Sequence, residues 1–215
     1  MKRLALLFLI PVFCAFVNPQ VIKKDIKQPV IEKTEIIGNV INTIAPHIEK
    51  KLSQEYGIII NKYSQQFDID WKIVVAIFKQ ESDFDIKAVN FRTRDFGIGQ
   101  FNYRNIVFFE IDLGKLLTDA DYAILQTYKL LYDLKKRHYH KEIGWYNRYH
   151  SGTPALRHKY QRLLNRKFLL IKRALKNEKS RTHGRTTGIN VPEMEGNWER
   201  IHSLRPVRVY QSYCT

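Results

Sequence analysis

The chain has 215 residues, of which 44% are hydrophobic and 27% charged, and this composition suits a globular protein with one ordinary hydrophobic core. Its formal net charge of +15 favours polyanionic partners, namely nucleic acid, anionic lipid or the acidic polymers of a bacterial envelope. The two cysteines, Cys14 and Cys214, exclude a disulfide framework and a zinc site built on paired cysteines, and the seven histidines show no HExxH-type pairing. We therefore expect no metal and no other cofactor.

The N-terminus has the pattern of an export signal. Two basic residues precede an apolar run over residues 4–17, which is short for a membrane span and typical of the apolar part of a secretory signal. The two candidate cleavage points place Phe13 or Val17 where small residues are normal. We interpret residues 1–18 as a signal peptide or an uncleaved N-terminal anchor, and we expect the protein in the periplasm or the cell envelope.

The next segments predict a linker and two helices. Residues 19–44 are rich in lysine, isoleucine and valine without a clear period, and we expect a linker there. After Ala45, apolar residues recur at helical spacing up to Phe67. A second helix is expected from Trp71, capped by Asp68 or Asp70. Its run of apolar residues has no polar face, which is typical of a helix in the middle of a domain.

The following segment contains two glycines close together and predicts a loop with short elements over residues 85–117. A third helix fits residues 118–137, with Thr118 or Asp119 as its cap. A fourth helix begins at Thr153-Pro154, because proline is favoured at the first helical position. The four helices together predict a mainly α fold.

Basic residues dominate the last predicted helix and its continuation. From Arg157 to Arg185 there are eleven lysines and arginines against one acidic residue, Glu178, which gives this segment a net charge of +10. The residues after it carry glycine, proline and scattered aromatic residues without a period. We expect one α-rich domain over residues 45–178, followed by a basic, poorly ordered tail over residues 179–215.

Glu81 is the candidate catalytic residue. One helical turn before it stand Ile77 and Phe78, so its carboxyl group should be partly desolvated. Desolvation and the C-terminal end of a helix both disfavour a negative charge, and both raise the pKa of the carboxyl towards the range of a general acid. Ser82 is placed to hydrogen-bond nearby backbone or the carboxyl itself. Taken alone, Glu81 would be interpreted as the solvated end of a helix rather than as a catalytic residue.

Two further clusters offer contacts for a substrate. Gly97 and Gly99 allow backbone conformations barred to other residues and a close approach of a ligand, and the amide of Gln100 suits an N-acetyl or hydroxyl group. Tyr146 and Asn147 combine an aromatic face, on which a pyranose ring can lie, with an amide. Each cluster also has an ordinary interpretation, the first as a turn and the second as a core patch beside a loop.

The order of these clusters resembles the catalytic domain of the soluble lytic transglycosylase (SLT) family, which is related in fold to goose-type lysozyme. The shared features are an apolar helix that ends in Glu81-Ser82, the segment from Asp95 to Gln100, and Tyr146-Asn147 after another helix. The resemblance covers roughly residues 46–170. The chain departs from the family pattern at Gly99, where the family often has methionine, and at Tyr149, where it has glycine.

The resemblance implies a single lysozyme-like domain that cleaves the glycan strands of peptidoglycan. By position, Glu81 would be the catalytic acid/base, Ser82 its hydrogen-bonding neighbour, Gly97 and Gln100 part of the substrate site, and Tyr146 and Asn147 cleft residues. The implied reaction breaks the bond between N-acetylmuramic acid and N-acetylglucosamine. Glu81 first gives and then takes a proton, and the muramoyl product closes a 1,6-anhydro ring.

Alternatives stay open at this point. If Asp95 positions a water, the outcome is hydrolysis, as in a goose-type muramidase. A non-catalytic basic protein that binds the wall or nucleic acid is another alternative. The export signal and the absence of a recognisable nucleic-acid-binding motif argue against specific binding to nucleic acid. The sequence also fits an enzyme that works alone, within a secretion or conjugation apparatus, or in a phage particle.

Overall fold

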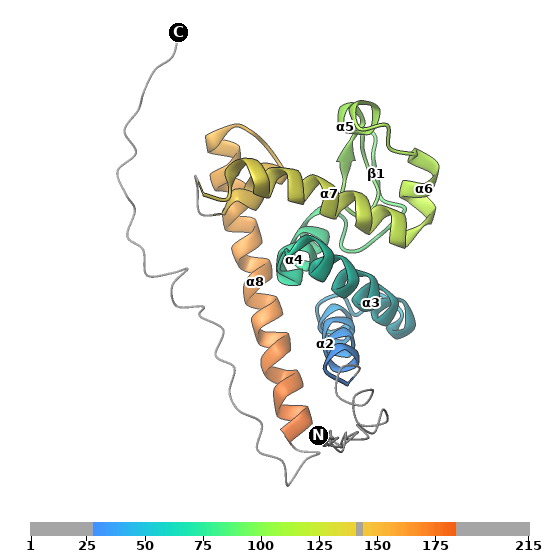
Figure 1. Ribbon diagram of the computed structural model, residues 1–215, viewed down its shortest axis with the longest axis vertical. Coiled ribbons are helices and arrows are strands. Elements are labelled where there is room, and N and C mark those ends of the chain that lie inside the picture. Colours follow the sequence, from blue (N-terminus) through green and yellow to red (C-terminus); the bar gives the residue numbers. More distant parts are fainter. Residues whose placement is uncertain (1–27, 141–143, 184–215) are drawn as a thin grey trace, which may run out of the picture. The chain divides into compact units, whose positions relative to one another are not determined.

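The computed structural model describes residues 28–140 and 144–183. Within them lie seven α-helices, one 3-10 helix (η1) and three short strands (Figure 1). In chain order these are α2 (Gln28–Ile44), α3 (Lys50–Phe67), α4 (Trp71–Glu81), β1 (Val89–Asn90), β2 (Asp95–Phe96), β3 (Phe101–Asn102), α5 (Tyr103–Phe108), α6 (Leu113–Thr118), α7 (Ala120–His138), η1 (Trp145–Tyr149) and α8 (Pro154–His183). The mainly α fold with one lysozyme-like domain is confirmed. The expected signal lies outside the described residues, and none of the described helices is long and apolar enough to cross a membrane.

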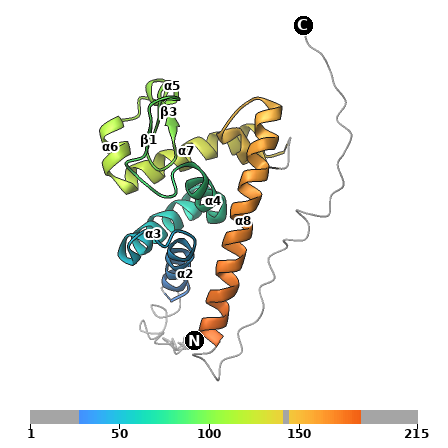
Figure 2. The same ribbon diagram turned by 180° about the vertical axis from the view of Figure 1, so that it is seen from behind.

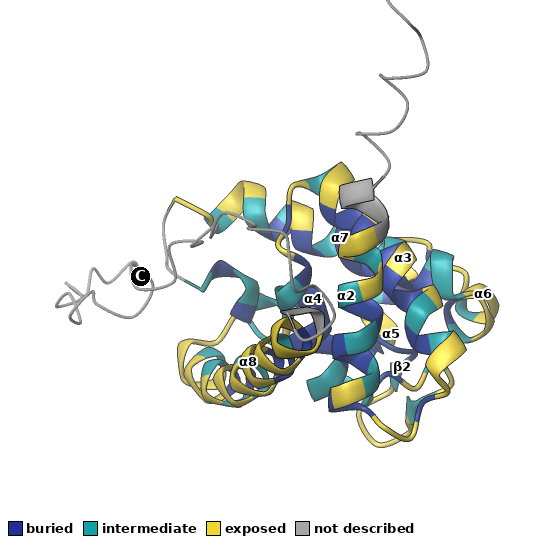
Figure 3. Ribbon diagram, turned by 90° about the horizontal axis from the view of Figure 1, so that it is seen from below, coloured by how far each residue is buried: buried dark blue, intermediate teal, exposed yellow. Residues whose placement is uncertain are grey.

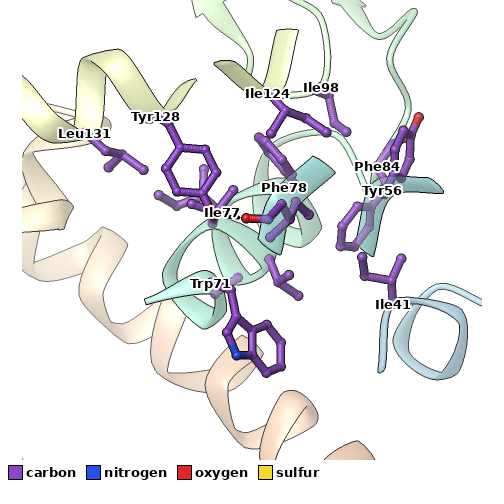
Figure 4. Close-up of a cluster of buried hydrophobic side chains, with 14 of the residues drawn as sticks. Ile41, Tyr56, Trp71, Ile77, Phe78, Phe84, Ile98, Ile124, Tyr128 and Leu131 are labelled. Atoms are coloured by element: carbon purple, nitrogen blue, oxygen red, sulfur yellow. Dashed lines mark hydrogen bonds between the residues drawn. The ribbon is translucent and has the colours of Figure 1, made fainter. Parts of the chain in front are cut away.

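Helix α4 lies at the centre of the hydrophobic core, as its sequence predicts. Asp70 caps it by accepting a hydrogen bond of 3.0 Å from the backbone N–H of Lys72. The side chains from Val74 to Phe78 are completely buried. Figure 4 shows residues of α2, α3, α7 and the loop after β2 around Ile77 and Phe78. A helix buried on all sides fixes the position of whatever residue ends it, and here that residue is Glu81.

The prediction of a linker over residues 19–44 is wrong for residues 28–44, which form α2. This helix packs on α3 through an apolar stripe with helical spacing. The prediction missed this stripe because it rested on the lysine-rich composition of the whole segment. The buried members of the stripe are Ile37, Val40, Ile41 and Ile44. A Cβ atom at Gly57 of α3 would lie 2.7 Å from the backbone nitrogen of Gly38, so glycine permits the close crossing of the two helices.

The segment over residues 85–117 contains short elements, as expected. Strands β1, β2 and β3 form an antiparallel sheet in the order β1-β2-β3, with Val89 opposite Phe96 and Asp95 opposite Asn102. Figure 2 shows these strands together with α5 and α6 beside one end of α7. The turn between β2 and β3 carries the two glycines of the candidate site, so the sheet presents that turn to the end of α4.

The two C-terminal helices begin where the sequence predicts. Asp119 caps α7 by accepting a hydrogen bond from the backbone N–H of Tyr122, and α8 starts at Pro154. Helix α8 continues to His183, so residues 179–183 are helical rather than part of a poorly ordered tail, whereas residues 184–215 lie outside the described part. Buried Glu178 accepts a hydrogen bond of 3.1 Å from Asn39 of α2. The side of α8 that carries its basic residues is exposed (Figure 3).

Candidate active site

The carboxyl group of Glu81 is held at the end of α4 by a tyrosine of α8. The hydroxyl of Tyr160 donates a hydrogen bond of 2.5 Å to Oε1 of Glu81. Burial raises the pKa of Glu81 to about 7, the hydrogen bond from Tyr160 acts in the opposite direction, and the negative charge of Asp95 raises it further. A carboxyl with this pKa is partly protonated near neutral pH, so it can give a proton and later take one.

Two tyrosines border this carboxyl. Tyr160 is buried, and its ring stacks on the ring of His150 with centroids 4.8 Å apart and an interplanar angle of 10°. Tyr149, at the end of η1, is near enough that burial and the charge of Glu81 both raise its pKa. The sequence places Tyr160 in the helix expected from Thr153-Pro154, and nothing in that pattern links it to Glu81. A buried tyrosine hydroxyl needs a hydrogen-bond partner, and that requirement was the one signal that could have drawn attention to it.

Asp95 is the second carboxyl of the site. It lies on β2, where its Oδ1 accepts a hydrogen bond of 2.9 Å from the amide of Asn102 on β3. In the described part of the chain no hydrogen bond joins Asp95 to Glu81, so Asp95 acts on Glu81 through its charge alone. The structure therefore combines one carboxyl whose pKa is raised, mainly by burial, with a neighbouring negative charge that adds to this rise.

The turn between β2 and β3 is held by the polar side chains of Ser82 and Gln100. Ser82, directly after Glu81, donates a hydrogen bond of 2.8 Å to the carbonyl oxygen of Ile98. Gly97 has a φ angle of +75°, which glycine adopts without strain, and Gln100 has a φ angle of +49°. The amide nitrogen of Gln100 donates to the carbonyl oxygens of Ala88 and Gly97, at 3.2 and 3.0 Å. Ser82 and Gln100 thus fix the turn against α4 and β1, and their contact with substrate stays a prediction.

Gly99 makes room for Tyr149. A Cβ atom at position 99 would lie 2.5 Å from the hydroxyl oxygen of Tyr149 and 2.8 Å from Oγ1 of Thr127. The Tyr149 hydroxyl donates a hydrogen bond of 2.7 Å to the carbonyl oxygen of Gly99. Both residues depart from the family pattern, and they meet in space. Tyr149 therefore occupies the volume that a larger side chain at position 99 would need.

Tyr146 and Asn147 connect η1 to α8. Asn147 is buried, and its amide nitrogen donates to Oε1 of Gln161, while the amide nitrogen of Gln161 donates to the Tyr146 hydroxyl at 3.5 Å. The ring of Tyr146 packs edge-on against Phe168, with centroids 5.9 Å apart. The Oδ1 atom of Asn147 is buried without a hydrogen bond from the described residues. The cleft role expected for this pair stays a prediction, and its visible contacts position the start of α8, from which Tyr160 reaches Glu81.

The family model for the transglycosylase SLT domain matches residues 58–169, just over half of the 215 residues. The chain belongs to this family. The match extends from within α3 to the middle of α8 and includes Glu81, Asp95 and Tyr160. Comparisons with curated proteins and with solved structures give no match. The SLT family consists of enzymes that cleave glycan, with peptidoglycan as the substrate, and the resemblance seen in the sequence is confirmed.

Proposed function

We propose that this SLT-domain protein is a lytic transglycosylase that cleaves the β-1,4 bond between N-acetylmuramic acid and N-acetylglucosamine and leaves a 1,6-anhydromuramoyl end. The observation that carries this proposal is the state of Glu81. Its pKa is about 7, and its carboxyl is held by the Tyr160 hydroxyl at the end of a completely buried helix segment. One group in this state can serve as the acid and then the base of the same turnover.

The proposed reaction has two steps. In the first step the proton of Glu81 moves to the glycosidic oxygen, the bond from that oxygen to the anomeric carbon breaks, and its electron pair stays with the oxygen of the leaving sugar. The N-acetyl oxygen of the muramoyl residue meets the positive charge on the anomeric carbon. In the second step the muramoyl C6 hydroxyl attacks this carbon, displaces the N-acetyl oxygen and loses its proton to Glu81. Glu81 returns to its starting state, and no water is consumed.

Hydrolysis of the same bond is the second candidate, and the charge of Asp95 beside Glu81 is the observation that favours it. A hydrolase with two carboxylates needs the second one to activate a water or to attack the sugar. Asp95 has Oδ1 engaged by Asn102, and its charge holds the proton on Glu81. This arrangement supports transglycosylation more than hydrolysis.

Mass spectrometry of the fragments released from purified peptidoglycan distinguishes the two outcomes. Anhydro ends are expected, whereas reducing ends would replace the transglycosylase proposal with hydrolysis. Glu81→Gln should abolish release, because glutamine cannot give the proton. Glu55→Gln, which changes an exposed glutamate of α3, is the matched control and should leave release intact. If Glu81→Gln releases fragments at the wild-type rate, Glu81 is not the acid.

We also propose that the protein acts outside the cytoplasm, in the periplasm or the cell envelope. The export pattern of residues 1–18 supports this location, and the net charge of +15 favours retention by anionic envelope polymers. A fusion of these residues to a reporter enzyme that is active only outside the cytoplasm tests the location. An inactive fusion would contradict it.

A further inference from the structure

A hollow lined by three arginines opens on the small sheet. Its volume is about 300 Å³. The lining residues are Arg92, Thr93, Arg94, Asn102, Tyr103 and Arg104. The turn between β1 and β2 supplies the first three, and the end of β3 with the start of α5 supplies the others. The sequence gives no sign of this cluster, because its two halves are brought together only by the pairing of the strands.

Hydrogen bonds to backbone atoms join the two segments that line this arginine hollow. The backbone N–H of Tyr103 donates a hydrogen bond of 2.8 Å to the carbonyl oxygen of Arg94. The amide of Asn102 donates to the carbonyl oxygen of Thr93 at 2.9 Å, and Asn90 accepts from the backbone N–H of Thr93 at 3.4 Å. These hydrogen bonds therefore hold in place the backbone that carries the arginines of the hollow.

The three arginines give the hollow an uncompensated positive charge. Arg92, Arg94 and Arg104 are all exposed, and among the described residues none of them forms a salt bridge with a carboxylate. A guanidinium group presents a planar set of N–H donors that matches a carboxylate or a phosphate group. Three such groups around one concavity are suited to a ligand with more than one anionic group.

The hollow adjoins the active site through Asn102. The same amide nitrogen that contacts Thr93 donates a hydrogen bond of 2.9 Å to Oδ1 of Asp95, and the charge of Asp95 raises the pKa of Glu81. Asp95 thus connects the wall of the hollow to the catalytic acid. The hollow therefore shares Asn102 with the second carboxyl of the site, and a ligand in the hollow would lie on the same small sheet as Asp95.

We propose that the arginine hollow binds the carboxylates of the peptide stems that the glycan strand carries, so that the enzyme prefers wall that bears peptides. This inference rests on the proposed function. Each muramic acid carries its stem on a lactyl group close to the bond that is cut, so a strand placed at Glu81 brings carboxylates to the neighbouring surface. Neutral sugars offer the arginines no such partner.

The test compares two substrates, intact peptidoglycan and glycan strands freed of peptide with an amidase. The variant Arg92→Gln/Arg94→Gln/Arg104→Gln in the full chain should lose about tenfold in kcat/KM on intact peptidoglycan, the size expected for three exposed charge-assisted contacts, and little on peptide-free strands. The matched control Arg162→Gln/Arg166→Gln/Arg173→Gln removes the same charge from the exposed face of α8 and should change the ratio of the two activities much less. The loss in the hollow variant should shrink as salt is added.

Several results would overturn the proposal. These are an equal loss on both substrates, no loss at all, or the same change of ratio in the α8 control. Inorganic phosphate at constant ionic strength is a further arm. If phosphate binds the wild type and not the hollow variant while the preference of the wild type for intact peptidoglycan stays unchanged, the hollow is a phosphate site and the proposal is wrong. If circular dichroism shows that the triple variant is unfolded, Arg92→Gln and Arg104→Gln carry the same comparison singly.

A binding measurement separates this proposal from the proposed function. If the wild-type protein cleaves neither substrate, the assignment as a transglycosylase fails, and co-sedimentation with the two substrates still tests the hollow. The full chain with Glu81→Gln should then sediment with intact peptidoglycan more than with peptide-free strands, and the three arginine substitutions should remove that preference. Equal sedimentation with both substrates would overturn the hollow as a site for peptide stems.

Discussion

The hydroxyl of Tyr149 donates a hydrogen bond of 2.7 Å to the carbonyl oxygen of Gly99, and its oxygen lies 2.5 Å from the position that a Cβ atom at residue 99 would take. The family pattern that the chain resembles often has methionine at position 99 and glycine at position 149. In this chain the small residue is at position 99 and the large one is at position 149. The Tyr149 side chain of η1 therefore fills the volume that a side chain at position 99 would otherwise fill. The two departures from the family pattern therefore form one compensated pair.

This compensation predicts a strong coupling between the two positions. Gly99→Met places its side chain against Tyr149 and should lower the free energy of unfolding by about 2 kcal/mol, and Tyr149→Gly should lower it by about 3 kcal/mol through the cavity it leaves. The double variant should lose at least about 1 kcal/mol less than the sum of the two, as a urea-unfolding double-mutant cycle would measure. Gly152→Met, at a position where a Cβ atom meets nothing within 4 Å, is the control for methionine itself. Strictly additive losses would show that the positions are independent.

Removal of the Tyr160 hydroxyl should move the activity of the enzyme to higher pH. Its hydrogen bond favours the charged form of Glu81, so Tyr160→Phe should raise the pKa of Glu81 above about 7. Because the acid must be protonated at the start of turnover, the alkaline limb of kcat/KM against pH should shift upwards by about one pH unit. Tyr132→Phe, on the exposed side of α7, should leave the limb in place. A downward shift would contradict the assigned role of this hydrogen bond.

Removal of the charge of Asp95 should have the opposite effect. Asp95→Asn keeps an oxygen that can accept from Asn102, while it removes the negative charge that helps to hold the proton on Glu81. The pKa of Glu81 should therefore fall, and the alkaline limb of kcat/KM should move to lower pH. Asp133→Asn, at a partly exposed position of α7 where the carboxylate pairs with Arg137, controls for the loss of one negative charge elsewhere. If Asp95→Asn instead changes the product from anhydro to reducing ends, or the reverse, Asp95 takes part in the chemistry.

The buried carboxyl should also make stability depend on pH. With a pKa raised to about 7, native Glu81 binds its proton more tightly than the unfolded chain does, so the free energy of unfolding falls as pH rises from about 4.5 to about 7. The full cost above this window is about 3 kcal/mol. Glu81→Gln removes the titration, so the variant should gain in melting temperature over the wild type at pH 8 and much less at pH 5. A constant difference at both pH values would show that Glu81 does not titrate in this window.

Local sequence signals predict much of the framework and the identity of the acid. Each of these signals lies within one or two helical turns of the feature that it predicts. They are the caps Asp70 and Asp119, the proline that starts α8 and the apolar neighbours of Glu81. Tyr160 could not be assigned in this way, because its partner Glu81 is 79 positions away and only the packing of α8 on α4 joins them.

The sequence also misjudges features whose physical cause lies outside the local segment. Helix α2 was taken for a linker, since its apolar stripe has meaning only against α3. Gln100 shows the same limit in a polar residue. Its amide suits a sugar, but the strand pairing presents it with the carbonyl oxygens of Ala88 and Gly97. The spacing of motifs identifies such polar residues. Which hydrogen-bond partners they take depends on the fold around them.

The long helix α8 contributes to the environment of the Glu81 carboxyl. It supplies Tyr160 to Glu81, and near its far end Glu178 anchors it to Asn39 of α2. Detachment of this helix would expose the Glu81 carboxyl to water, and the pKa of a hydrated glutamate lies far below neutral. The raised pKa of Glu81, and with it a supply of protons near neutral pH, therefore depends on the packing of α8 against the core.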